Sequence, residues 1–280
     1  MRGIVVREKG LSKKRAMKEL REIRSHFDRR GFNNAINWID SLRKDIKQNN
    51  PFDKEMYFED IFNATKRDIN QYGEYPSKTF EILVKVFLTT ATSNRAKFRS
   101  ILEEAYPLLQ DWRLTQENLL NIEKIVSPNI QNLETVARFY FSCFLYLISI
   151  EGSYDNWIKI IYFILYNFVE KIGVNYDEVE KMSLQNVKKW LTNRGIDDII
   201  FLGYEDGHLR NAIAHAHLTY IESTEEMLFT DRYRGQITYE KSLNLLDFYQ
   251  CFQKIHNVID ICTIIILLLR ISDILFVHAK

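Results

Sequence analysis

Apolar residues recur every three to four positions along most of this 280-residue chain, which is the spacing of one face of an α-helix. The pattern is clearest over residues 11–30, where Ser12 stands at a position suited to an N-terminal cap. The apolar face of that segment consists of Ala16, Leu20, Ile23 and Phe27. Further helices are predicted over 33–48, 54–71, 77–92, 95–110 and 115–126. The least regular of them is 77–92, because it is rich in β-branched residues that also suit strands.

The chain becomes more apolar after Ser127-Pro128-Asn129, a turn-forming sequence that indicates a domain boundary. Before it we predict an N-terminal helical region, 1–130, whose role the sequence does not indicate. After it we predict a helical bundle domain, 131–280. Either part is long enough to bury a core of its own.

Three helices are predicted in the first part of this bundle. Two of them, 131–150 and 156–172, are strongly apolar and are separated by Glu151-Gly152-Ser153. The third is predicted to follow a capping serine, Ser183, and to end near Thr192.

A fourth helix is predicted to begin after Asp206, a favourable N-cap residue. The segments 217–221 and 227–239 then alternate between apolar and polar residues, which predicts a short β-hairpin with a polar turn near Arg234-Gly235. A long apolar helix over about 240–276 is predicted to close the domain. We therefore predict an all-α fold: a helical bundle with a short β-hairpin insertion, preceded by an N-terminal helical region.

Composition supports this prediction. The chain contains 10 glycines and 4 prolines, about 5% of its residues where about 12% is usual. The net charge is only +1, yet residues 1–50 hold 14 Lys and Arg against 6 Asp and Glu. That excess suits contact with RNA phosphates, and it equally suits the solvated face of an amphipathic helix.

The cysteines and the apolar segments bear on the cellular compartment. Cys143, Cys251 and Cys262 are odd in number and widely spaced, so they suggest neither a disulfide framework nor a zinc site. The chain does not start with a signal-peptide pattern, and the uncharged apolar stretch 261–269 is too short to span a bilayer before Arg270 interrupts it. We expect a cytoplasmic protein that does not associate with membranes.

The stretch 209–217, Leu-Arg-Asn-Ala-Ile-Ala-His-Ala-His, carries the most informative chemistry. The guanidinium of Arg210 keeps its charge and matches phosphate oxygens in shape, and His215 is of a residue type that exchanges a proton near neutral pH. Asn211 lies four residues before His215, so a helix would place both on one face beside Arg210. Cleavage of an RNA phosphodiester without a metal requires both a cation that binds the phosphate and a group that transfers protons.

The order Arg, polar residue, three mostly apolar residues, His is similar to the signature of the HEPN superfamily. The order of predicted elements over 131–280 also resembles a HEPN domain of the abortive-infection or toxin type. This resemblance implies a metal-independent endoribonuclease that leaves 2′,3′-cyclic phosphate ends and pairs so that two motifs face each other across a dimer. It implies no cofactor, an RNA substrate, and an antitoxin or defence-system protein as a possible partner.

On this interpretation Arg210 binds the phosphate and His215 transfers protons. Asn211 orients the histidine or binds substrate, and His217 extends the motif as a supporting residue. Because one histidine cannot act as base and acid in the same step, a two-fold dimer would supply the second copy of each group. Glu151 is a candidate partner for Arg210, or simply the end of its own helix.

Several alternatives compete with this assignment. Arg210 could be an ordinary surface cation and His215 a packed core histidine. A second pair with the same spacing, Arg21 and His26, has a charged middle and lacks apolar packing. A zinc site is conceivable, although its ligands would have to reach around the helix; they would be Asp206, His208, His215 and His217. Finally, the bundle could be a non-catalytic interaction module, such as an antitoxin or scaffold.

Overall fold

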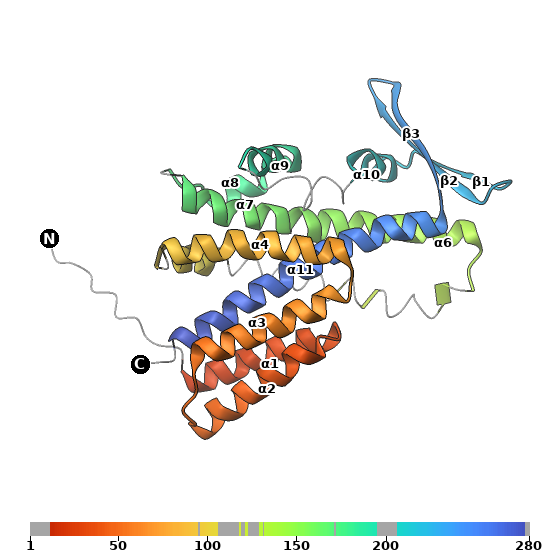
Figure 1. Cartoon of the computed structure of the whole chain (residues 1–280). Coiled ribbons are helices and arrows are strands. Elements are labelled where there is room, and N and C mark those ends of the chain that lie inside the picture. The colour runs from red at the N-terminus through yellow and green to blue at the C-terminus, as the bar shows by residue number, and fades with distance from the viewer. Residues whose placement is uncertain are drawn as a thin grey trace. The chain divides into compact units, whose positions relative to one another are not determined.

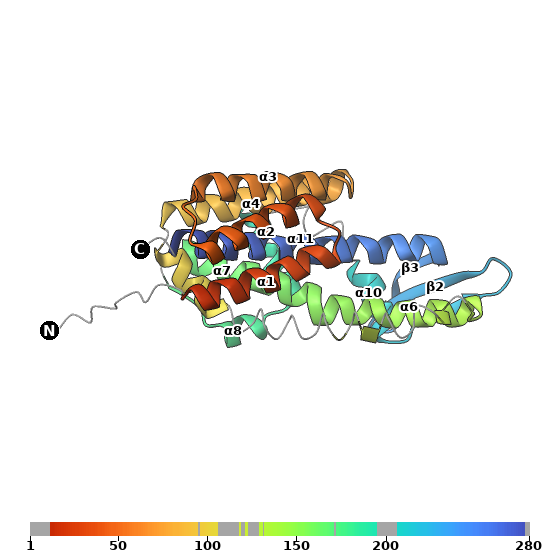
Figure 2. The same ribbon diagram turned by 90° about the horizontal axis from the view of Figure 1, so that it is seen from below.

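The computed structural model describes residues 12–94, 96–105, 118, 121–122, 129–130, 132–170, 172–194 and 206–277. Helices dominate, and a small three-stranded antiparallel sheet precedes the last helix (Figures 1 and 2). The predicted helical fold with a β insertion is confirmed. The predicted boundary at Ser127-Pro128 lies outside the described residues, so the division of the chain at residue 130 stays a prediction.

Two compact units are present. One contains the described residues up to Leu83 together with those from Ile261 onward, and the other is Val84–Asp260. The predicted functional motif lies in the second unit.

The first unit contains α1 (Lys13–Arg29), α2 (Asn33–Gln48) and α3 (Lys54–Asn70). The Ser12 side chain caps α1, as predicted, by accepting a hydrogen bond from the backbone N–H of Arg15. The N-terminus of α2 has no side-chain cap of its own. It is capped instead by the buried Asp68 of α3, which accepts a hydrogen bond from the backbone N–H of Ala35 at 3.1 Å.

Helix α4 covers Glu74–Ser93, so the segment with the least regular pattern is a helix, as predicted. Its buried residues Phe80, Leu83 and Phe87 follow one face at helical spacing. Of the next two predicted helices, residues 96–105 are helical, and most of 106–126 lies outside the described residues.

The second unit is built around α6 (Thr135–Ser149) and α7 (Asp155–Val169). The predicted break between them is wrong: residues Ile150–Tyr154 form a π-helical turn that joins the two helices. Both ends of that turn are fully buried, and the side chain of Asn156 donates a hydrogen bond to the Gly152 carbonyl at 2.9 Å. Burial and this bond keep the chain helical through a glycine that would otherwise favour a break.

Two shorter helices follow, α8 (Tyr176–Glu180) and α9 (Leu184–Asn193). Ser183 caps α9, as predicted, by accepting a hydrogen bond from the backbone N–H of Asn186. The sheet consists of β1 (Leu218–Ile221), β2 (Glu226–Tyr233) and β3 (Gln236–Asn244) in that order.

The closing helix, α11, is Leu245–Val277 and begins five residues later than predicted. Residues 240–244 pair with β2 instead, in a register that ends with Asn244 opposite Glu226. The cross-strand ladder therefore overrides the helical periodicity of this segment. Within the described part of the chain, no helix is both long and apolar enough to cross a membrane.

An aromatic cluster fixes the sheet to the helices of the second unit. The fully buried ring of Phe248 in α11 stacks on Phe229 of β2, with the ring centroids 5.5 Å apart. It also contacts Phe139 and Tyr146 of α6. The hairpin that carries part of the site is thus held by the core of the unit.

Candidate active site

The predicted motif begins in α10 (Gly207–Ala214). Asp206 caps it as predicted, because its side chain accepts hydrogen bonds from the backbone N–H groups of His208 and Leu209, both at 3.1 Å. Leu209 and Ala212 are fully buried and Ile213 nearly so. This apolar face packs into the unit, and the polar residues of the motif lie on the remaining surface of the helix.

The helix ends earlier than the motif does. Its last residue is Ala214, so His215 is the C-cap rather than a residue inside the helix, although its N–H still bonds to the Asn211 carbonyl at 3.0 Å. The following residue, Ala216, has a left-handed backbone (φ 54°). The N–H of His217 reaches the Ala212 carbonyl at 2.8 Å. This is a Schellman termination, and it brings both histidines to the end of the helix.

This termination predicts a stabilising substitution at Ala216. The left-handed conformation costs an alanine about 1 kcal/mol and a glycine almost nothing. We expect Ala216→Gly to raise the free energy of unfolding by about 1 kcal/mol, measured by urea denaturation. The control is Ala214→Gly, at the last residue of the helix, where the backbone is right-handed and a glycine is expected to lower the free energy of unfolding, by up to about 0.5–1 kcal/mol. A destabilised Ala216→Gly protein would contradict the assigned termination.

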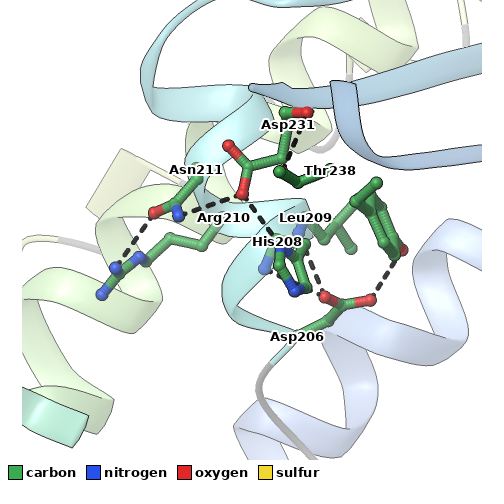
Figure 3. Close-up of polar contacts among 8 residues, drawn as sticks. Asp206, His208, Leu209, Arg210, Asn211, Asp231 and Thr238 are labelled. Atoms are coloured by element: carbon green, nitrogen blue, oxygen red, sulfur yellow. Dashed lines mark hydrogen bonds and ion pairs between the residues drawn. The ribbon is translucent and has the colours of Figure 1, made fainter. Parts of the chain in front are cut away.

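A chain of polar contacts runs from Arg210 to the sheet (Figure 3). Nη2 of Arg210 donates a hydrogen bond to Oδ1 of Asn211 at 3.1 Å. The amide nitrogen of Asn211 donates to Oδ2 of Asp231, in β2, at 3.3 Å. Asn211 therefore uses both ends of its amide, and it connects the motif arginine to a carboxylate of the hairpin.

Asp231 also binds His208. Nδ1 of His208 lies 2.9 Å from the same Oδ2, and the side chain of Asp231 is 10% exposed while that of His208 is 55% exposed. Burial by itself would raise the pKa of Asp231. The hydrogen bonds from His208, Asn211 and the backbone of Arg232, with the charge of His208, outweigh burial and lower it. The carboxylate is thus ionised at neutral pH and acts as an acceptor.

Tyr239 of β3 completes the contact between hairpin and helix. Its hydroxyl donates a hydrogen bond to Oδ2 of Asp206 at 2.7 Å, and its ring stacks on that of His208 with the centroids 5.1 Å apart. Burial, followed by the hydrogen bond to Asp206, raises the pKa of Tyr239. The hydroxyl therefore stays protonated and keeps donating at neutral pH, which holds β3 against the first turn of α10.

Sequence reasoning missed Asp231, His208 and Tyr239 as members of this network. A signal for Asp231 exists, since it follows Met227 and Phe229 at alternate positions of β2, and all three are buried. An acidic residue on the inward face of a strand requires a partner.

The two histidines at the end of α10 differ in their surroundings. His215 is exposed, so its interpretation as a packed core histidine is wrong. The His217 ring lies 6.0 Å from that of His215 and is half-buried, and no partner for its buried Nδ1 is present among the described residues. The His217 carbonyl accepts a hydrogen bond from the backbone N–H of Thr230, so this residue also ties the end of the helix to β2.

Comparison with known proteins places the part of the chain that contains these residues in a family. The model of the HEPN pEK499 p136 family matches residues 113–261. The chain belongs to the HEPN pEK499 p136 family. The predicted HEPN resemblance is thereby confirmed for the C-terminal half. A search of curated proteins and a search of solved structures each returned no match.

In this HEPN domain, His208, Asn211 and His215 follow one another at spacings of three and four residues, which places them along one side of α10 and its C-cap. Arg210 is adjacent and is linked to Asn211. The described residues hold no group of three or more His, Cys, Asp or Glu side chains suited to a metal ion. The site therefore offers an oriented cation and, five residues later at the end of α10, an exposed imidazole, which are groups for binding a phosphate and for moving a proton.

Proposed function

We propose that this HEPN protein is a metal-independent endoribonuclease that acts as a toxin or antiviral-defence effector in the cytoplasm. One observation carries the proposal. The Arg210 guanidinium is held through Asn211 by the buried carboxylate of Asp231, within one turn and a half of the exposed His215. A fixed cation and an exposed imidazole five residues apart suit a phosphodiester better than a neutral ligand.

In the proposed reaction the 2′-hydroxyl of the substrate attacks the neighbouring phosphorus. His215 takes the hydroxyl proton, and Arg210 holds the phosphate oxygens as negative charge develops on them. The bond from phosphorus to the 5′-oxygen breaks, and a second acid protonates that oxygen. The products are a 2′,3′-cyclic phosphate and a 5′-hydroxyl. A two-fold homodimer would supply the second acid as His215 of the other copy.

The test is cleavage of one sequence in three chemical forms, in buffer containing EDTA. We expect the purified protein to cleave single-stranded RNA and to leave 2′,3′-cyclic phosphate ends. The same sequence as DNA, or as RNA with 2′-O-methyl groups, should stay intact because it lacks the attacking hydroxyl. Light scattering after size exclusion would measure the expected dimer.

Two results would overturn the proposal. Cleavage of the 2′-O-methyl RNA would show that the 2′-hydroxyl is not the nucleophile. A folded dimer that cleaves no RNA, with or without a candidate activator, would favour a non-catalytic interaction module. Exposed aromatic side chains on α6, Tyr140 (48%) and Phe144 (52%), would suit a protein partner in that case.

A further inference from the structure

Beyond Asp231 the hairpin continues as a two-stranded ribbon that no longer packs on the helices. Figure 1 shows the paired ends of β2 and β3 extending past α10. The ladder shifts register between Asp231 and Arg232, so Thr238 is the extra residue of a bulge. Residues 232–237, which we call the arm, are all exposed. The arm thus begins at the bulge and ends at the turn.

The turn of the arm has an unusual residue in it. Tyr233 pairs with Gln236, which leaves a two-residue connection, and both of its residues have positive φ: 51° at Arg234 and 81° at Gly235. This is a type I′ geometry, whose first position favours Asn, Asp or Gly. An arginine in that position is strained. An arginine at a position that disfavours it is a reason to examine this side chain for a role in binding.

The side chains of the arm suit single-stranded nucleic acid. The guanidinium of Arg234 lies over the Tyr233 ring, 5.2 Å from its centroid, and Tyr233 remains 63% exposed. Residues 232–237 contain two arginines, one tyrosine and no carboxylate. Neither arginine forms a side-chain ion pair within the described part of the chain. An exposed aromatic face between two unpaired cations is suited to stacking a base and to binding the phosphates next to it.

We propose that the arm binds the single-stranded RNA next to the bond that is cut, with a base stacked on Tyr233 and a phosphate on Arg234 or Arg232. The position of the arm relative to the cut bond rests on the proposed function. The base of the arm is Asp231, which holds the Arg210 network, and the two or three residues from there to the tip span about 7–10 Å. The arm would thus hold a nucleotide one or two positions from the scissile phosphate.

The experiment measures binding apart from cleavage. A fluorescein-labelled single-stranded RNA is titrated with the His215→Ala protein, in EDTA, and its anisotropy gives Kd. When Tyr233→Ala is introduced into this His215→Ala protein, RNA binding should weaken about 5- to 100-fold, which is the range for loss of one base stack. Tyr233→Phe should keep Kd within about twofold because the ring is preserved. The matched control is Tyr140→Ala, which removes another exposed tyrosine, from α6 (48% exposed against 63% for Tyr233), and should leave Kd unchanged.

Arg234→Asn separates binding from folding. We expect it to raise Tm by about 1–3 °C, because asparagine tolerates the left-handed backbone. It should nevertheless weaken RNA binding and lower the slope of log Kd against log salt by about 0.7, the value for one phosphate contact on a single strand. A loss of affinity in a more stable protein cannot come from unfolding.

The outcomes distinguish this proposal from the proposed function. If the natural chain cuts no RNA but the Tyr233 and Arg234 variants lose RNA binding, the proposed role of the arm is supported and the nuclease assignment is wrong. If the protein binds RNA and the arm variants bind it equally well, the arm proposal is overturned. It is also overturned if a folded protein binds no RNA. Loss of the dimer in Tyr233→Ala, seen by light scattering, would identify a second copy as the occupant instead.

Discussion

Replacing His215 with alanine is expected to lower kcat/KM for RNA cleavage by about 1,000-fold, within the range for loss of a general acid–base group. The effect is large because a dimer of the variant would lack the imidazole in both copies, and so would lose base and acid together. Arg210→Ala is expected to cost about 100- to 1,000-fold, as for loss of a group that stabilises developing charge.

The measurement is initial-rate cleavage of end-labelled RNA by each variant, with circular dichroism to show that it is folded. Arg210→Lys should fall between Arg210→Ala and the natural chain, since lysine keeps the charge but not the planar fork. The chain supplies its own control in Arg21→Ala and His26→Ala, a pair at the same spacing inside α1. These two control variants should cleave RNA at the normal rate. Full activity of His215→Ala would exclude His215 as the proton-transfer residue.

Asp231→Ala is expected to reduce kcat by about 10- to 100-fold, comparable to the loss of an outer partner that orients a catalytic group. Asp231 does not need to touch substrate for this effect. It holds Asn211, which in turn holds the Arg210 guanidinium. Without the carboxylate that guanidinium loses part of what fixes its direction, so less of the binding energy is available in the transition state.

A double-mutant cycle tests whether Asp231 acts through Asn211. We expect Asn211→Ala to match Asp231→Ala and the double variant to be no worse than either, because both changes break the same chain of contacts. A variant at Glu240, an exposed acid of β3, is the control for simple loss of negative charge. If the two effects multiply instead, the residues act independently and the positioning role is wrong.

The lowered pKa of Asp231 also gives this carboxylate a pH-dependent effect on stability. A carboxyl group whose pKa is lower in the folded than in the unfolded state contributes stability above its unfolded pKa, and this contribution is lost as pH falls through the folded value. The difference in Tm between the natural chain and Asp231→Asn should therefore be largest near neutral pH and shrink below about pH 4. A difference that does not change with pH would contradict an ionised, hydrogen-bonded Asp231.

Local sequence signals located most helices and their caps. The periodic apolar residues of α1 and α2 and the capping side chains of Ser12, Ser183 and Asp206 act within one or two turns, so neighbouring residues suffice to predict them. The turn at Arg234-Gly235 was found for the same reason. The π-helical turn at residues 150–154 and the extension of β3 to Asn244 were not found, because burial and cross-strand pairing decide them.

The sequence by itself determined the helical character of this protein, its HEPN motif and the identity of Arg210, Asn211 and His215 as candidates. Only the tertiary structure showed that His215 caps the helix and is exposed, and that Asp231, 21 residues after Arg210, holds the network together. The physical reason is distance along the chain. Helix periodicity and capping are set by residues within a few positions, whereas the partners of a buried carboxylate are set by how the hairpin folds back on α10.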